Sequence, residues 1–383
     1  MAKIESVSVC VARVPLDNAV TFSTRTVTAR EYCLVKVRST DGVEGLGYCY
    51  AVNTSGRLLA VAVTDLLGRH LPGQDSLRVE GLWQEMYQDA LLQGRVGAAM
   101  RALSAIDTAL WDLNARTVKL PLYKYLGAMV EDSVPAYASG GYYLPGKTPE
   151  KLGEELKGYV RDGFKAVKMK TGRLSPGEEE ARIRAAREAI GPDVLLMLDA
   201  NNAWRDLPTA LTYMERLEPY SPYWIEEPFS PDDIDNHARL AQRTRVTVAT
   251  GEIEAGRWRF KELMDKGGAG ILQTDATVCG GVSEWRRIAA TAASYGITVS
   301  PHAWHDVHVH CAASASNAGH VEFMPDDHIV NFRRLIDTQL VAKDGNLLLP
   351  KTPGLGFGFD PEAIARYGTR QPGATDVWQA VRS

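Results

Sequence analysis

Apolar and polar residues alternate over residues 3–14 and 31–40, near the start of the chain. Such alternation is typical of antiparallel strands that bury one face. Asp41-Gly42 is a turn signal, and the stretch from Val43 to Tyr48 predicts a third strand that returns beside the second. The segment Asp17 to Arg30, between the first two strands, is largely polar and without periodicity. We expect it to form a long loop, either a lid or a plain connection.

Helical periodicity follows these strands. Apolar residues recur at three- and four-residue spacing over residues 57–69, 75–91 and 96–116, which predicts three helices. The third segment is apolar around much of its circumference, so this helix is expected to be buried. Three strands followed by three helices predict an α+β domain that ends near residue 125.

The pattern changes after residue 125 to short apolar runs that alternate with helical segments. Strand–helix units repeated at intervals of roughly 20 to 30 residues are the signature of a parallel β/α barrel. We therefore predict an α/β fold with an α+β capping domain over residues 1–125 and a barrel over residues 126–334. A turn-rich tail over about 335–383 is expected to pack back on the capping domain. The eight expected strands lie near residues 134, 164, 194, 223, 246, 271, 297 and 321, and the eighth helix is poorly marked.

Composition narrows the classes of function. The chain has 383 residues, of which 45% are hydrophobic and 23% charged, enough for two domains of which one is barrel-sized. The net charge of −4 argues against nucleic acid and against an anionic membrane surface as partners. No apolar run approaches the roughly 20 residues of a membrane span, and the start lacks the core of a signal peptide. The five cysteines have no metal or redox spacing, so we expect reduced thiols and a cytoplasmic location.

Three successive predicted strands each end in a carboxylate, at Asp199, Glu226 and Glu252. An acid at the end of a buried strand is costly unless something pairs with it. If the strands lie side by side, the three carboxylates converge on one point. Three hard oxygen ligands at one point suit Mg²⁺. The sequence therefore predicts a metal site at the mouth of the barrel.

Titratable side chains stand at other strand ends too, where the active sites of such barrels lie. Lys168 and Lys170 are two residues apart on one strand and so point to the same side. Crowding of their ammonium groups is expected to lower each pKa toward that of a useful base. Asp275 follows the sixth strand and His302 the seventh, so the aspartate would fix the tautomer of the histidine. Glu322 ends the eighth strand.

A rival hypothesis takes four histidines together as a metal cluster. We rank it low, because the later histidines should begin the next helix and no cysteine or acid joins them at zinc-like spacing. The residues are His302, His305, His308 and His310.

The combined motifs resemble the enolase superfamily, mandelate racemase subgroup, over nearly the whole chain. The matching residues are Lys168-Met-Lys170, Asp199-Ala-Asn201, Trp224-Ile-Glu226-Glu-Pro, Gly251-Glu252, Asp275-Ala-Thr-Val-Cys-Gly-Gly, Ser300-Pro-His302 and His320-Val-Glu322. The resemblance implies an N-terminal capping domain on a modified (β/α)7β-type TIM barrel, and a homo-oligomer. It also implies that Asp199, Glu226 and Glu252 bind Mg²⁺.

Roles for further residues follow from the same resemblance. It implies that Lys170 and the His302–Asp275 dyad stand on opposite faces of the substrate as acid/base groups. Lys168 and Glu322 would contact the substrate carboxylate. Positions that touch substrate in the family are matched by Asn201 and, more weakly, Ser139. Capping-domain loops set specificity in this superfamily, so Arg25, Tyr50 and Asn53 are candidates for the far end of the substrate. Trp304 and His305, just past His302, are suited to a polyhydroxy chain.

The chemistry agrees with these roles. Removing a proton next to a carboxylate creates a second negative charge on the same group. A divalent cation, Lys168 and a protonated Glu322 would stabilise the resulting ene-diolate. Expulsion of a β-hydroxyl as water, with His302 as the acid, would then make the enzyme an aldonate or aldarate dehydratase that gives a 2-keto-3-deoxy acid.

Three alternatives remain open at this stage. A proton returned to the other face would give a racemase or epimerase of a 2-hydroxy acid. Cycloisomerisation of a sugar-acid lactone has the same first step. A non-catalytic barrel that binds an acid sugar ranks low, because none of the expected acids and bases has been lost.

Overall fold

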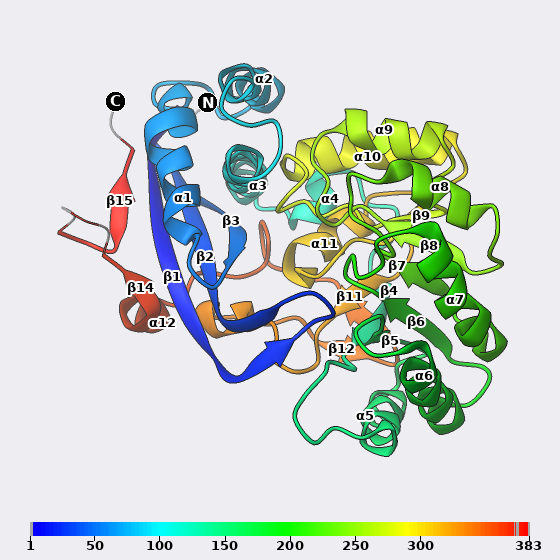
Figure 1. The fold of residues 1–383 in the computed structure, drawn as a ribbon. Helices are drawn as coiled ribbons and strands as arrows, with labels where there is room; N and C mark the ends of the chain where they lie inside the picture. Colours follow the sequence, from blue (N-terminus) through cyan, green and yellow to red (C-terminus); the bar gives the residue numbers. More distant parts are fainter. Residues whose placement is uncertain (1–2, 371, 373–374, 382–383) are drawn as a thin grey trace.

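The computed structural model describes residues 3–370, 372 and 375–381. The first two residues of the predicted capping domain and parts of the predicted tail lie outside this part of the chain. Figure 1 shows a sheet with helices beside it, built from the start of the chain, next to a barrel built from its middle. Among the described residues, no helix combines the length and the apolar character needed to cross a membrane.

The capping sheet is antiparallel and contains the three predicted strands. Its strands β1 (Ile4–Thr21), β2 (Thr26–Ser39) and β3 (Glu44–Val52) pair in chain order. Helix α3 (Ala98–Thr117) packs very closely on β3. A Cβ atom on Gly47 would lie 2.0 Å from the carbonyl oxygen of Ala105, so only glycine allows this approach.

The prediction of a long loop over residues 17–30 is wrong. β1 continues to Thr21 and β2 begins at Thr26, so the segment is the outer end of a long hairpin. Val20 pairs with Val27 across it, and both side chains are buried, which holds the two strands together. The register of the β1–β2 pairing shifts between Pro15 and Val20. This shift interrupts the alternation of apolar and polar residues that predicts the first two strands.

The three predicted helices of the capping domain are present with altered ends. The first is divided into α1 (Gly56–Val61), a π-helical turn (Ala62–Leu67) and a 3-10 turn (Gly68–His70). The second, α2 (Val79–Ala90), begins four residues later than predicted. The third, α3, has 15 buried residues, as its apolar circumference predicts.

All eight predicted barrel strands are present. They are parallel neighbours in chain order, and β11 pairs with β4, which joins the last strand to the first. Their bounds are β4 (Ser133–Ser139), β5 (Ala166–Lys170), β6 (Leu195–Asp199), β7 (Trp224–Glu226), β8 (Thr247–Thr250), β9 (Ile271–Leu272), β10 (Thr298–Val299) and β11 (Val321–Phe323).

A helix follows each of the first seven strands. These helices are α5 (Pro149–Arg161), α6 (Pro176–Ile190), α7 (Leu207–Leu217), α8 (Ile234–Ala241), α9 (Arg257–Asp265), α10 (Gly281–Ser294) and α11 (His305–Ala312). After β11 the described chain forms only a 3-10 turn (Phe332–Leu335) before it leaves the barrel. The fold is therefore the modified (β/α)7β barrel with a capping domain that was predicted.

The tail contacts both parts of the molecule. β12 (Ala342–Lys343) and β13 (Asn346–Leu348) form a hairpin, and β13 pairs antiparallel with β4 of the barrel. After α12 (Pro361–Tyr367), the short strands β14 (Gly368–Thr369) and β15 (Trp378–Ala380) both pair with β1 of the capping sheet. We propose the division of the chain at about residues 125 and 335 on this basis.

Aromatic side chains join the capping sheet to the barrel. The ring of Tyr48 on β3 stacks on Phe332 with 3.8 Å between centroids. Tyr32 on β2 meets Trp304, which follows β10, edge to face at 5.7 Å. All four side chains are at most 2% exposed. This buried contact holds the capping sheet over the barrel mouth.

Candidate active site

The three predicted metal ligands come together. Asp199 and Glu226 are the last residues of β6 and β7 and pair directly across the sheet, while Glu252 lies two residues beyond β8. Each offers one carboxylate oxygen, and the three oxygens lie within 4.8 Å of one another. All three residues are buried. Neighbouring parallel strands thus bring together acids that are far apart in the sequence.

This cluster has the character of a cation site. Burial and the nearby Asp199 raise the pKa of Glu226 well above its usual value, with Lys168 acting in the opposite direction. Oε2 of Glu252 is buried and has no hydrogen-bond partner among the described residues. Uncompensated buried carboxylates are costly, and oxygen-only ligand sets suit hard divalent cations. The residues therefore fit Mg²⁺.

The lysine pair does not behave as predicted. Nζ of Lys168 lies 2.7 Å from Glu226 Oε1 and 2.7 Å from Glu322 Oε1, and Nζ of Lys170 forms an ion pair with Asp199. Burial lowers the pKa of each lysine, but these carboxylates outweigh burial and raise both pKa values above the usual range. Lys168 does lower the pKa of Lys170, but by less than Asp199 on the neighbouring strand raises it.

Glu322 is also charged, contrary to the protonated form expected from the sequence. Burial raises the pKa of Glu322, but Lys168, His302 and Lys170 together lower it well below its usual value. Oε2 of Glu322 accepts a hydrogen bond of 2.7 Å from the backbone N–H of Ala303. A carboxylate held by an ammonium group and a backbone amide remains ionised.

The predicted histidine–aspartate dyad is present. Nδ1 of His302 lies 2.9 Å from Oδ2 of Asp275, and Oδ1 of the aspartate accepts hydrogen bonds from the backbone and hydroxyl of Thr277. Burial lowers the pKa of His302, but Glu252 and Asp275 outweigh it and raise that pKa to about 9. Nε2 of His302 lies 3.6 Å from Glu252, so this nitrogen is on the side of the acidic cluster.

The rival histidine metal cluster does not form among the described residues. His308 is bonded on both ring nitrogens, to the carbonyl of Ala303 and to the N–H of Ala276. His310 is likewise bonded to the carbonyl of Leu355 and the N–H of Tyr123. A ring nitrogen that accepts from an N–H has no lone pair left for a metal, so these histidines are structural.

One pocket of about 150 Å³ lies between the capping domain and the barrel mouth. Most predicted site residues line it: Arg25, Tyr50, Lys170, Asn201, Glu252, His302, Trp304 and Glu322. Ser139 and Lys168 do not line it, although Ser139 is buried at the end of β4 and Lys168 is buried in the middle of β5. Asn53 does not line it either, because its side chain accepts from the N–H of Thr28 at the hairpin.

Besides Glu252 and Glu322, two lining residues carry buried polar atoms without a hydrogen-bond partner in the described chain. They are Oδ1 of Asn201 and Nε1 of Trp304. Both residues also have positive φ angles, 45° and 33°, which is rare outside glycine. Strained backbone together with unpaired buried polar atoms is typical of ligand-binding sites.

Sequence reasoning missed two arginines that line the same pocket, Arg30 on β2 and Arg101 in the first turn of α3. Arg30 falls in the segment predicted to be a loop. Arg101 is the one charged side chain in an apolar stretch of the predicted buried helix, from Val96 to Ile106, and this was a usable signal.

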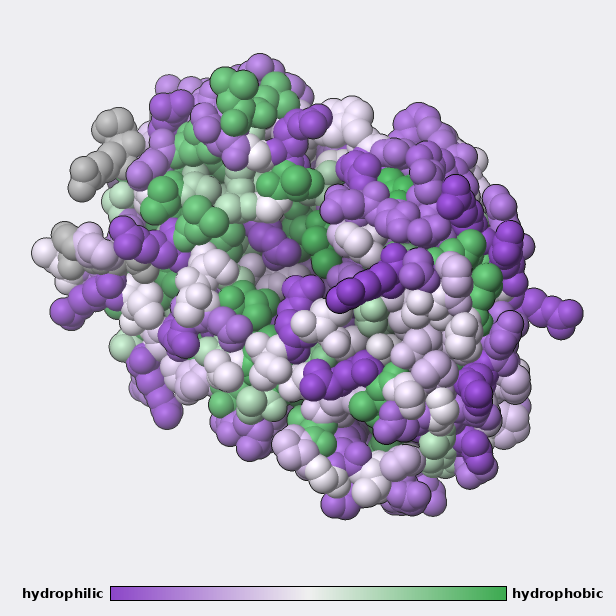
Figure 2. Space-filling model, in the orientation of Figure 1, coloured by the Kyte–Doolittle hydropathy of each residue, from purple (hydrophilic) through white to green (hydrophobic). Residues whose placement is uncertain are grey.

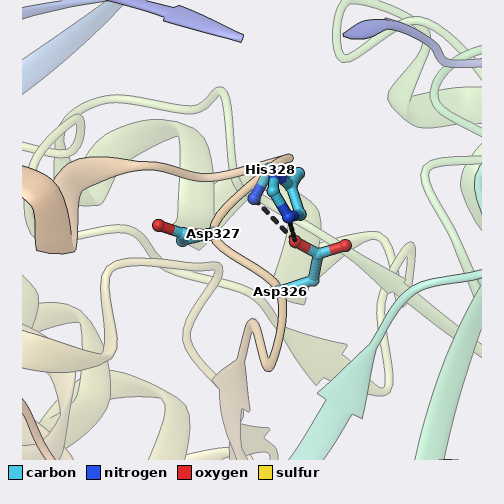
Figure 3. Close-up of side chains that lie close together, drawn as sticks. All are labelled: Asp326, Asp327 and His328. Atoms are coloured by element: carbon cyan, nitrogen blue, oxygen red, sulfur yellow. Dashed lines mark hydrogen bonds and ion pairs between the residues drawn. The ribbon is translucent and has the colours of Figure 1, made fainter. Parts of the chain in front are cut away.

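A second acidic group lies beyond β11, and Figure 3 shows its side chains close together. They are Asp326, Asp327 and His328. Asp327 already accepts a 2.8 Å bond from Arg334, and His328 pairs with Asp17 of the capping hairpin. These residues tie the hairpin to the barrel, and their existing partners argue against a second metal site.

Comparison with known protein families identifies the family to which this chain belongs. Residues 3–127 match the model of the mandelate racemase / muconate lactonizing enzyme N-terminal domain, and residues 151–363 match the enolase C-terminal domain-like model. The chain belongs to the mandelate racemase/muconate lactonizing enzyme family of the enolase superfamily.

Three known enzymes are similar to this chain over most of their length. The chain is 33% identical to 3,6-anhydro-alpha-L-galactonate cycloisomerase of Streptomyces coelicolor, over 95% of this chain and 99% of that one. It is 35% identical to arabinonate dehydratase of Saccharolobus solfataricus, over 88% and 90% of the two chains. A crystal structure of L-talarate/galactarate dehydratase liganded with Mg and L-glucarate has a TM-score of 0.89 and 29% identity, over 96% and 92%.

Proposed function

We propose that this protein is a Mg²⁺-dependent dehydratase that converts a sugar acid to a 2-keto-3-deoxy acid. One observation carries the proposal: Lys170 and His302 line the same pocket beside the carboxylates of Asp199, Glu226 and Glu252. A base, an acid and a cation site around one small pocket are the parts that proton abstraction next to a carboxylate requires. The similarity to an arabinonate dehydratase supports dehydration as the outcome.

Asp199, Glu226 and Glu252 would hold the metal. When bound there, Mg²⁺ would withdraw electrons from the substrate carboxylate and offset the charge of Asp199 that keeps Lys170 protonated. Lys168 lies behind the cluster, bonded to Glu226 and Glu322, and fixes both carboxylates in place.

The proton steps use Lys170 and His302. Nζ of Lys170, in its neutral form, takes the proton from the carbon next to the substrate carboxylate. The electron pair of that C–H bond forms the double bond of the ene-diolate. The hydroxyl on the next carbon then leaves with the proton from Nε2 of His302, as water. Nδ1 of His302 stays bonded to Asp275, which orients the ring and stabilises its protonated form.

A second candidate is an isomerase. Two acid/base groups beside one pocket would also return a proton to the opposite face, which gives racemisation or epimerisation. The similarity to a cycloisomerase of an anhydro sugar acid favours cycloisomerisation as a further outcome of the same first step. The alternatives differ only in what happens after the proton is removed.

The cellular location and the oligomeric state of the enzyme are also part of the proposal. All five cysteines are buried and unpaired, which supports a reducing cytoplasm. A homo-oligomer is supported by exposed apolar side chains on the capping domain, where Figure 2 shows a hydrophobic surface at the upper left. Leu58 and Val61 on α1 are 59% and 43% exposed, and Leu92 is 91% exposed.

A turnover screen tests the proposal. The protein with Mg²⁺ is incubated in D₂O with aldonates, aldarates and sugar-acid lactones, and both 2-keto acid formation and α-deuteration are followed. A 2-keto acid from one substrate is the expected result. Deuteration without loss of water would replace the dehydratase by a racemase or epimerase. Binding of an acid sugar with neither reaction would favour a non-catalytic barrel.

A further inference from the structure

Apart from the exposed Arg25, two cationic side chains of the pocket have no acidic partner among the described residues. Arg30 and Arg101 both come from the capping domain and line the pocket, and no carboxylate of the described residues forms an ion pair with either. Lys170, which comes from the barrel and also lines the pocket, differs because it forms an ion pair with Asp199. Arg30 is buried and Arg101 is half-buried. Charges removed from water are normally paired, so cations in such positions without a counter-charge point to a missing anion.

Arg30 is held in place and keeps donors to spare. Its residue is only 5% exposed, and Nε donates a 2.6 Å hydrogen bond to the carbonyl of Ile329. The guanidinium carbon lies 5.9 Å from the ring centre of Phe22, across the capping hairpin. The two terminal nitrogens have no hydrogen-bond partner among the described residues, and such a pair of parallel donors matches a carboxylate.

Arg101 is fixed in a comparable way. Nη1 donates a 3.2 Å hydrogen bond to the carbonyl of Tyr50, and the guanidinium lies 4.4 Å from the centre of the Tyr50 ring. That ring is 4.6 Å from Trp304 and 6.3 Å from His302, so Arg101 stands over the histidine side of the pocket. Both arginines are thus oriented before any ligand binds.

The first carboxylate of a substrate does not need these arginines. The metal ligands and both lysines come from barrel strands, whereas Arg30 and Arg101 come from β2 and α3 of the capping domain. The reacting carboxylate would lie at the barrel side, so the arginines are left for the opposite end. A hydroxyl group at that end would hydrogen-bond to them but would leave two positive charges without a counter-charge.

We propose that the substrate is a dicarboxylate sugar acid, an aldarate, and that Arg30 and Arg101 bind the carboxylate at its far end. This rests on the proposed function, because it names the substrate class for the same site. It also divides the pocket into a reacting end built by the barrel and a recognition end built by the capping domain.

The test compares sugar acids that differ at one group only. Six-carbon aldarates and aldonates of the same configuration carry a carboxylate or a hydroxymethyl group at the sixth carbon. For the wild-type enzyme we expect kcat/KM to favour the aldarate by about 100-fold or more, since a site built to pair with a group rejects the analogue that lacks it.

Substitution shows whether the two arginines cause this preference. In R30Q and R101Q we expect kcat/KM for the aldarate to fall about 100-fold, while kcat/KM for the aldonate changes little. R30K keeps the charge but loses the fork, so its loss should be smaller. R13Q is the matched control on the same sheet, because Arg13 pairs with Glu31 and does not line the pocket. Unchanged melting temperatures would exclude misfolding.

The outcomes separate this proposal from the proposed function. Turnover of an aldonate as fast as the matching aldarate would overturn the dicarboxylate proposal and leave the dehydratase standing. Equal losses on both acids in R30Q and R101Q would also overturn it. If no sugar acid reacts, the proposed function fails, and binding of the two acids is then measured by calorimetry with Mg²⁺. Tighter binding of the aldarate than of the aldonate, lost in R30Q and R101Q, supports the dicarboxylate proposal. Equal binding of the two acids, or no binding, overturns it.

Discussion

Nδ1 of His302 lies 2.9 Å from Oδ2 of Asp275, although the two residues are 27 positions apart and follow different barrel strands. The aspartate is fully buried and is held by Thr277 on its other oxygen. Its hydrogen bond orients the imidazole and leaves Nε2 on the side of Glu252. We propose from this geometry that His302 acts as the proton donor through Nε2.

The first prediction concerns the charge of His302. In metal-free protein the pKa is about 9, because Glu252 and Asp275 outweigh the effect of burial. Replacing Asp275 by asparagine removes one of these charges, so the pKa should fall. Imidazole NMR titration in the presence of a chelator measures it, with H302N used to assign the signal. An unchanged pKa in D275N would mean that the aspartate does not act on the ring.

The second prediction concerns the metal. Mg²⁺ bound only by the folded protein raises the melting temperature, and at 100 times its dissociation constant it stabilises by about 2.7 kcal/mol. E252Q removes one carboxylate from the cluster that includes Asp199 and Glu226, so it should abolish most of this shift.

The second acidic group provides the control for the metal experiment. Asp326 lies with Asp327 and His328, which already have partners. D326N should therefore leave the Mg²⁺-dependent rise in melting temperature as it is in the wild type. A loss of the rise in D326N, with none in E252Q, would place the metal at the loop after β11.

A third prediction concerns the contact between the two domains. Asp107 on α3 is buried and accepts hydrogen bonds of 2.6 and 2.9 Å from the hydroxyl and the N–H of Ser283 on α10. Burial outweighs these bonds and raises the pKa of Asp107 from 3.8 to about 7. Since the folded state favours the neutral acid, this stability is present below pH 4 and is lost as the pH rises toward 7.

D107N tests this contact. Asparagine keeps the shape but cannot ionise. Its oxygen can accept from the N–H of Ser283, and its NH2 group can donate to the Ser283 hydroxyl. The wild type should lose up to about 1.4 kcal/mol per pH unit between the two pKa values from this group, and D107N should not. Melting temperatures between pH 5 and pH 8 measure the difference. Parallel curves for the two proteins would show that Asp107 is charged at neither or at both ends of this range.

The catalytic side of the fold could be predicted because parallel strands place their ends together. Asp199, Glu226 and Glu252 follow three consecutive strands, so their convergence needs no knowledge of distant contacts. The pKa values of the lysines could not be predicted in this way. The carboxylates that raise them, such as Glu322 beside Lys168, come from other strands at distances that the sequence does not reveal.

The capping domain was harder to predict for a similar reason. The pairing of β1 with β2 is irregular beyond Pro15, and this breaks the alternation of apolar and polar residues. The sequence therefore predicts a loop where the structure has the outer end of a hairpin. Arg30 and Arg101 are on the pocket only because the sheet is held over the barrel by packing such as that of Tyr48 on Phe332. Contacts between domains of this kind depend on shape and leave no local pattern in the sequence.

Proton exchange by H302N separates the two proposed catalytic roles. We propose that Lys170 removes the proton next to the carboxylate and that His302 releases the hydroxyl. With the substrate found in the screen, H302N in D₂O with Mg²⁺ should still exchange the α-proton for deuterium while forming 2-keto acid at least about 100-fold more slowly. An H302N protein that eliminates water at the wild-type rate, or that cannot exchange the proton at all, would contradict this division of roles.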